Sequence, residues 1–349
     1  MKKLSIINAC TDLGVNVDGA QFGPETLTKD FANIVSHIYS VNERDEKKKE
    51  TANLFNQNTN LKEINDFVQE FNRLLLLMHE LHFEKNMESD VANHYYQKMH
   101  DLVLAVKALD TKNEKRNLIQ INHFNHELYH TVKKVIADGE FPLTVGGDHI
   151  IAIASALASI SQNQNLGIIW FDSHADYNTY STSVTGNLHG LPLAVATHYE
   201  KDMLADFHQG PFYSPKNTVI VGGRDIDPWE WSNVINAGVT VFSTEDIHQY
   251  GVEEICKKAF AIAGNGTNGV HISYDLDLID PHVAPGVSVP AKNGITLEEV
   301  HALSNEIIKY KSIIRSADLV EFNPLKDKDH VTESIAKEIL KAFVENFGK

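Results

Sequence analysis

Cysteine is scarce in this chain of 349 residues, which contains only Cys10 and Cys256. Two thiols are too few to build a disulfide framework or a cysteine-based zinc cluster within one chain. We therefore expect the protein to work in a reducing compartment, the cytoplasm. Hydrophobic residues make up 42% of the chain, which is enough for a substantial buried core in one large domain or two ordinary ones.

Positive charge is also in short supply, because 31 Lys and Arg residues face 47 Asp and Glu residues and the formal net charge is -16. This balance argues against nucleic-acid and membrane partners and favours small cations as ligands. No apolar run approaches the roughly 18 residues that a membrane-spanning helix requires. The apolar run near the N-terminus stops at Asn8, so it predicts a first strand rather than a secretory leader.

Glycine and proline are both missing from residues 25–138. A long stretch without strong helix breakers is typical of helices. Within it, residues 65–83 place apolar side chains at helical spacing. We predict that residues 25–138 form a mainly helical elaboration.

The remaining chain alternates short apolar runs with helical patterns. The predicted strands are 4–8, 142–145, 166–171, 219–222, 239–242, 270–274 and 314–322, and the predicted helices include 149–161, 252–262, 297–311 and 332–345. Such alternation predicts an α/β fold in which helices cover both faces of a mainly parallel sheet. Because no repeat or linker divides the chain, we expect residues 1–349 to form a single α/β domain that carries the helical elaboration.

Four predicted strand ends carry polar side chains, and the carboxyl ends of parallel strands commonly form binding sites. The segments VGGDHI, WFDSHAD, SYDLDLIDP and LVEFNP contribute His149, then Asp172, His174 and Asp176, then Asp275 and Asp277, and finally Glu321. Alternate residues of an extended segment share a face, so the members of each cluster can point the same way. Taken singly, each acid would more commonly be a cap or an ion-pair partner.

The combination of these clusters predicts a metal centre. Four carboxylates placed close together require strong positive charge between them, and two divalent cations would supply it. Two imidazoles and four carboxylates without a thiolate suit manganese better than a structural zinc. Such a centre generates a bridging hydroxide near neutral pH, and its residual negative charge favours a cationic electrophile.

The ordered motifs GGDH, DSHAD, GNLHG, DLDLIDP and EFNP resemble those of the ureohydrolase superfamily, which includes arginases, agmatinases and formimidoylglutamases. The resemblance covers residues 139–325 and, less strongly, residues 19–27. It implies a three-layer α/β/α sandwich with a mainly parallel sheet and two Mn²⁺ ions per chain. It also implies a homo-oligomer, a trimer or a hexamer.

The resemblance implies a role for each matching residue. One manganese ion would be bound by His149, Asp172, Asp176 and Asp275, and the other by Asp172, His174, Asp275 and Asp277. Asp176 would also pass a proton to the leaving amine, His189 would shuttle protons, and Glu321 would pair with a substrate guanidinium.

The loop GGRDIDPWE resembles the arginase loop that meets the substrate α-amino group, with Asp227 and Glu230 as the matching acids. An acidic pair beside a cationic amine gives charge-assisted hydrogen bonds, and we take it to favour an amino acid substrate over the decarboxylated agmatine. The substrate α-carboxylate would be met by Asn178, Thr185 and Asn187.

These residues predict hydrolysis of L-arginine, a small cationic guanidino substrate, to L-ornithine and urea by attack of a metal-bridging hydroxide. Agmatinase, formimidoylglutamase or another amidino hydrolase is the alternative, and a non-catalytic arginine-sensing regulator of the same fold is a second one. Three departures from the arginase pattern stand out: Thr185 replaces a common serine, while Ser288 and Val289 replace glycine and threonine in a turn near the guanidinium. The last two predict a modest turnover.

Overall fold

The sheet runs through the centre of the structure, a computed structural model that describes residues 3–43, 117–201 and 203–348. Its strands are β1 (Leu4–Cys10), β2 (His37–Asn42), β3 (Phe141–Gly146), β4 (Gly167–Phe171), β5 (Thr218–Gly222), β6 (Thr240–Ser243), β7 (Val270–Asp275) and β8 (Ile314–Val320). The spatial order is β2-β1-β3-β8-β7-β4-β5-β6, and every neighbouring pair is parallel. All seven predicted strands are therefore present.

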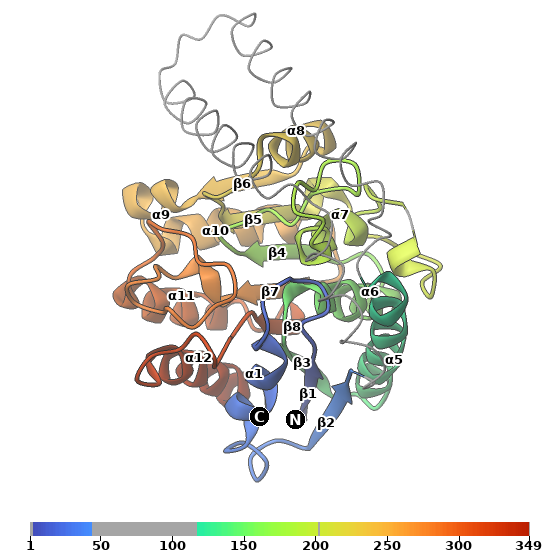
Figure 1. Cartoon of the computed structure of the whole chain (residues 1–349), viewed down its shortest axis with the longest axis vertical. Helices are drawn as coiled ribbons and strands as arrows, with labels where there is room; N and C mark the ends of the chain where they lie inside the picture. Colours follow the sequence, from blue (N-terminus) through green and yellow to red (C-terminus); the bar gives the residue numbers. More distant parts are fainter. Residues whose placement is uncertain (1–2, 44–116, 202, 349) are drawn as a thin grey trace, which may run out of the picture. The chain divides into compact units, whose positions relative to one another are not determined.

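Helices form a layer on each side of this sheet. They are α1 (Gly23–Thr28), α5 (Leu118–Ala137), α6 (Ala152–Asn163), α7 (Pro192–Ala196), α8 (Pro228–Ala237), α9 (Thr244–Tyr250), α10 (Val252–Ala263), α11 (Leu297–Lys309) and α12 (Val331–Phe347). In Figure 1, α10, α11 and α12 cover one face of the sheet, whereas α5, α6 and α7 cover the other. The predicted three-layer α/β/α sandwich is confirmed. Among the described residues, no helix is both long enough and apolar enough to cross a bilayer.

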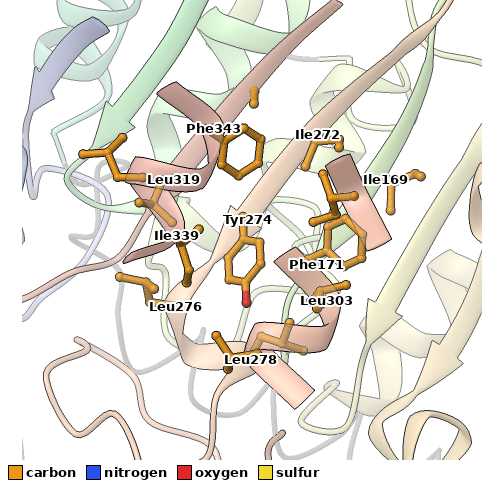
Figure 2. Close-up of a cluster of buried hydrophobic side chains, with 14 of the residues drawn as sticks. Ile169, Phe171, Ile272, Tyr274, Leu276, Leu278, Leu303, Leu319, Ile339 and Phe343 are labelled. Carbon is orange, nitrogen blue, oxygen red and sulfur yellow. The ribbon is translucent and has the colours of Figure 1, made fainter. Parts of the chain in front are cut away.

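The central strand β4 is apolar throughout because both of its faces are buried. In β4, Ile169 and Phe171 pack into the layer of α10, α11 and α12, while Ile168 and Trp170 pack into the opposite layer. Figure 2 shows part of the hydrophobic cluster between the sheet and the layer of α10, α11 and α12. Tyr274 of β7 lies there among side chains of the sheet and its covering helices. This packing holds the strand ends in fixed positions.

The segment predicted to be mainly helical is only partly described. Its described ends contain α1, α5 and the edge strand β2, which the sequence did not predict. The predicted helical stretch 65–83 lies outside the described residues, as does most of the elaboration 25–138. The described residues belong to one compact unit.

Candidate metal centre

Four neighbouring strands in the middle of the sheet end in the polar side chains singled out by the sequence. Strands β3, β8, β7 and β4 lie next to one another in that order. They are followed by His149, Glu321, Asp277 and Asp172, respectively. Because the strands are parallel, these ends meet at one edge of the sheet, which is where ligands bind in open α/β folds.

His149 begins a short 3₁₀ turn after β3, and its side chain faces three carboxylates. Its Nδ1 atom lies 3.1 Å from Oδ2 of Asp172 and 3.0 Å from Oδ2 of both Asp176 and Asp275. All four side chains are buried. The structure thus brings together the complete first predicted ligand set.

A second cluster adjoins the first and shares Asp172 with it. Nδ1 of His174 lies 3.0 Å from Oδ2 of Asp277 and 3.5 Å from Oδ1 of Asp172. Asp172, His174 and Asp277 form one group of possible metal ligands, and His149, Asp172 and Asp176 form another. Asp275, predicted for both sets, contacts this cluster by accepting the backbone N–H of Asp277 at 2.7 Å.

Two of the atoms that would face the cations have no hydrogen bond within the protein. Nδ1 of His149 and Oδ2 of Asp176 are buried without a hydrogen-bond partner. An unpaired buried polar atom costs roughly 1–3 kcal/mol, so such atoms normally mark a missing partner. Imidazole nitrogens and carboxylate oxygens together suit a divalent ion such as manganese, so the residues present fit a pair of such ions.

The close approach of the carboxylates raises the pKa values of two of them. Burial and the charges of Asp277 and Asp172 raise the pKa of Asp275 well above its ordinary value. Burial and the charge of Asp172 raise the pKa of Asp176 to about 6. Bound cations would remove this repulsion, because opposite charge favours the ionised carboxylate.

Two residues that the sequence did not point to hold the ligands in place. Oγ of Ser273 lies 2.8 Å from Nε2 of His149, which leaves Nδ1 to face the acids. Trp170 donates its indole N–H to Oδ2 of Asp172 at 2.9 Å, and its ring stacks on His149 with the centroids 4.1 Å apart. Partners of this kind orient metal ligands. The sequence could have indicated Ser273, because it precedes Asp275 by two residues in β7 and therefore lies on the same face of the strand.

Two of the predicted catalytic residues have a left-handed backbone. The φ angle is 48° at Asp176 and 67° at Glu321. Residues other than glycine rarely adopt such angles, which cost free energy and are concentrated at functional sites. The surrounding structure therefore forces both carboxylates into their positions.

Glu321 and His189 form a hydrogen-bonded pair beside the possible metal ligands. Nδ1 of His189 lies 3.0 Å from Oε1 of Glu321, which also accepts the backbone N–H of His149 at 2.8 Å. Burial opposes protonation of His189, but the hydrogen bond and charge of Glu321 raise its pKa above the ordinary value. Oε2 of Glu321 is buried without a hydrogen-bond partner, so it is available for a cationic group.

The two acids predicted to meet the substrate amine have different surroundings. Glu230 is buried, and its oxygens accept the backbone N–H groups of Tyr177 at 2.8 Å and Asp227 at 3.2 Å. Asp227 is only partly buried, and Asn178 beside it favours its ionised form. Burial and the charge of Asp225 raise the pKa of Asp227. The structure thus engages Glu230 with the backbone and leaves Asp227 as the acid closer to solvent.

The residues predicted to meet the substrate carboxylate lie on the loop between β4 and α7. Asn178 and Asn187 are buried, whereas Thr185 is exposed. Nδ2 of Asn187 donates to Oδ1 of Asn16 at 3.3 Å, and the backbone N–H of Asn187 donates to Oγ1 of Thr185 at 3.2 Å.

The turn that departs from the arginase pattern lies beside β8. Ser288 is buried, and its Oγ accepts the side-chain amide of Asn323 at 3.2 Å. Val289 is only partly buried. The serine hydroxyl is therefore already paired within the protein.

Comparisons with known proteins agree with this geometry. The model of the arginase family matches residues 2–344. An arginase of Bacillus subtilis (strain 168) is 35% identical over 245 residues, which cover 70% of this chain and 82% of that relative. An arginase of Brevibacillus brevis is 38% identical over 231 residues, which cover 65% of this chain and 76% of that relative.

Solved structures extend the similarity over the whole chain. The arginase of Bacillus caldovelox superimposes with a TM-score of 0.75 at 26% identity, covering 100% of this chain and 99% of that one. The formimidoylglutamase of Bacillus subtilis superimposes with a TM-score of 0.65 at 15% identity, covering 100% and 88%. The second similarity concerns the fold alone.

Proposed function

Because the chain belongs to the arginase family and is a hydrolase acting on carbon–nitrogen bonds of linear amidines, we propose that it converts L-arginine to L-ornithine and urea. The observation that carries this proposal is the contact between the acidic loop and the metal cluster. Glu230, on α8, accepts the backbone N–H of Tyr177, the residue that directly follows Asp176. This contact supports the proposal, because it holds a residue proposed for the amino acid head next to one proposed for catalysis.

We also propose two Mn²⁺ ions per chain. His149, Asp172, Asp176 and Asp275 would hold one, and Asp172, His174, Asp275 and Asp277 would hold the other. When bound, the pair would supply a nucleophile near neutral pH and neutralise the four carboxylates.

The protein's own residues position the substrate and move protons. The free oxygen of Glu321 would accept hydrogen bonds from the guanidinium and hold its carbon beside the cluster. As an oxygen derived from water bonds to this carbon, Asp176 would take up the proton of that oxygen. When the bond from the carbon to the ornithine nitrogen breaks, Asp176 would pass the proton to this nitrogen. His189, with 16% of its side chain exposed, would exchange protons with solvent.

The head-group contacts separate L-arginine from its closest analogues. Agmatine keeps the amine of arginine and lacks the carboxylate, so discrimination against it rests on the donors Asn178, Thr185 and Asn187. The acidic pair, which the sequence led us to expect to exclude agmatine, therefore cannot separate the two compounds. Asp227 would instead recognise the amine, which 5-guanidinopentanoate lacks.

The test is hydrolysis of four compounds by the purified, manganese-loaded protein: L-arginine, agmatine, 5-guanidinopentanoate and N-formimidoylglutamate. We expect kcat/KM for arginine to exceed that for agmatine at least about 100-fold, because unmatched polar groups in a binding site are costly. Faster hydrolysis of agmatine or N-formimidoylglutamate than of arginine would overturn the substrate assignment.

A variant then tests the role of Asp227. Asp227→Asn, which removes the charge and keeps the shape, should lower kcat/KM for arginine by about 10-fold to 100-fold, as expected for loss of a charged hydrogen bond. The value for 5-guanidinopentanoate should stay within about threefold. Equal losses for both compounds would contradict the assignment of the amine to Asp227.

The remaining predictions concern the cellular location and the oligomeric state of the protein. Both cysteines are free and buried, which supports a cytoplasmic location. A homo-oligomer, trimer or hexamer, is part of the proposal, and sedimentation of the purified protein tests it.

A further inference from the structure

Three polar side chains form a hydrogen-bonded relay next to the proposed head-group contacts. Nδ2 of Asn233, on α8, donates to Oγ1 of Thr182 at 3.2 Å and to the backbone carbonyl of Tyr177 at 3.1 Å. Oγ1 of Thr182 in turn donates to Oδ1 of Asn178 at 2.9 Å. Asn233 and Asn178 are buried. The relay therefore connects α8 to a residue proposed to bind the substrate.

The hydrogen of the Thr182 hydroxyl has a defined direction. A hydroxyl has one donor hydrogen and two acceptor lone pairs. Here the oxygen accepts from the amide N–H of Thr179 at 2.8 Å and from the side chain of Asn233. Its own hydrogen can reach Oδ1 of Asn178 at 2.9 Å, Oγ1 of Thr179 at 3.2 Å or the carbonyl oxygen of Thr179 at 3.5 Å, and the shortest of these contacts is the strongest.

The direction of the Thr182 hydroxyl hydrogen determines which side of the Asn178 amide carries Oδ1 and which carries Nδ2. Oδ1 accepts from Thr182, so Nδ2 is on the other side of the amide, where it favours the ionised form of the neighbouring Asp227 carboxylate. The reversed amide would place Oδ1 against that carboxylate and an N–H₂ group against the Thr182 hydroxyl. Both changes exchange a hydrogen bond for a repulsive or poorly matched contact.

We propose that Thr182 and Asn233 are positioning residues for recognition of the amino acid head group. By fixing the Asn178 amide, they direct one N–H to Asp227 and leave the second N–H for the substrate carboxylate. The proposal rests on the proposed function, because it assumes that Asn178 meets that carboxylate. Neither residue touches the substrate itself.

The first test compares two substitutions of Thr182 in the full-length, manganese-loaded protein. Thr182→Val keeps the shape and removes the hydroxyl, so we expect KM for L-arginine to rise about tenfold while kcat changes less than about twofold. Thr182→Ser keeps the hydroxyl and should restore KM to within about twofold of the unmodified protein. Ser181→Ala is the matched control, because its hydroxyl contacts Thr179 rather than Asn178, and its KM should not change.

Competitive inhibitors separate positioning from a general structural effect. In Thr182→Val, the inhibition constant of 5-guanidinopentanoate, which has the carboxylate, should rise about tenfold. The inhibition constant of agmatine, which lacks it, should change less than about twofold. Parallel weakening of both inhibitors, or loss of bound manganese, would make the relay a purely structural element and overturn the proposal.

Asn233→Asp provides an independent variant. A carboxylate only accepts hydrogen bonds, so the Thr182 hydroxyl would turn toward the new carboxylate and release Asn178. We expect the same rise in KM for arginine as in Thr182→Val. If the unmodified protein hydrolyses arginine but all these variants retain its KM, the positioning role is wrong. If the unmodified protein itself does not hydrolyse arginine, it is the proposed function that fails.

Discussion

At the scale of single residues, Asp275 and Asp277 of the candidate centre each divide their two oxygens between different tasks. Oδ1 of Asp277 accepts the Ser173 hydroxyl at 2.7 Å, while its Oδ2 faces His174. Asp275 is arranged in the same way, with one oxygen on a backbone amide and the other facing His149. One oxygen is held by the protein and the other remains open for a cation.

This division leads to a prediction for Asp277. Asp277→Ala removes an open oxygen from the second cluster, so bound manganese should fall from two ions per chain to one, with at least about a 100-fold loss of arginine hydrolysis. Metal analysis of the dialysed protein and a urea assay measure the two effects. Asp225→Ala, which removes an exposed neighbouring acid, should retain both ions. A variant at Asp277 that keeps two ions and full activity would contradict the ligand assignment.

The clustering of these possible metal ligands could be predicted from the sequence, because their spacing at strand ends is itself the signal. Asp172, His174 and Asp176 alternate after an apolar run, and the structure brings them together with His149. The contact of Trp170 with Asp172 could not be predicted in the same way, since an indole in a buried strand looks like core. The engagement of Glu230 with two backbone amides also depends on tertiary structure that spacing does not encode.

At the scale of elements, the segment that follows β3 lies between the ends of β1 and β8 and is hydrogen-bonded to both. The backbone N–H of Gly147 donates to the carbonyl of Ala9 at 2.9 Å, and its carbonyl accepts from Glu321 at 2.8 Å. A Cβ atom at Gly147 would lie 1.8 Å from the carbonyl oxygen of Thr11. Only glycine lets these three segments approach so closely.

Gly147→Ala should therefore shift the segment that carries His149. We expect a loss of at least about 2 kcal/mol in the free energy of unfolding, as for other overpacked sites, together with weaker manganese binding. Urea unfolding and metal titration measure these quantities. Gly139→Ala serves as a control, since its φ of 77° is strained but no atom lies within 4 Å of the added Cβ. That variant should lose about 1 kcal/mol and bind manganese normally.

Most of the strands that the sequence predicted are buried along their whole length, as are β1, β3, β4, β5 and β7. Strand β2 was missed because it lies at the sheet edge, where most of its side chains are partly or fully exposed and no apolar run develops. The predicted strand 314–322 ends earlier, at Val320, because Glu321 adopts a left-handed backbone. Such a local conformation follows from the site and not from strand propensity.

At the scale of the whole molecule, buried acids oppose folding unless cations accompany them. Ligands that bind only the folded state stabilise it by mass action, by about 4 kcal/mol at a thousand times the dissociation constant. We expect the thermal midpoint of the protein in manganese chloride to lie several degrees above that in EDTA, measured by calorimetry. The increase should be smaller for Asp277→Ala. An identical midpoint in both conditions would show that the acids do not bind manganese.

The order of the strands also has a consequence for how the protein is made. Strand β8, near the C-terminal end of the chain, joins β3 to β7, and within the described sheet no other strand links these two halves. His149 belongs to one half, whereas the carboxylates that surround it belong to the other. During synthesis on the ribosome, which proceeds from the N-terminus, the pocket cannot assemble until β8 has emerged. Binding of the proposed metal ions would therefore be among the last events in the maturation of the newly made polypeptide.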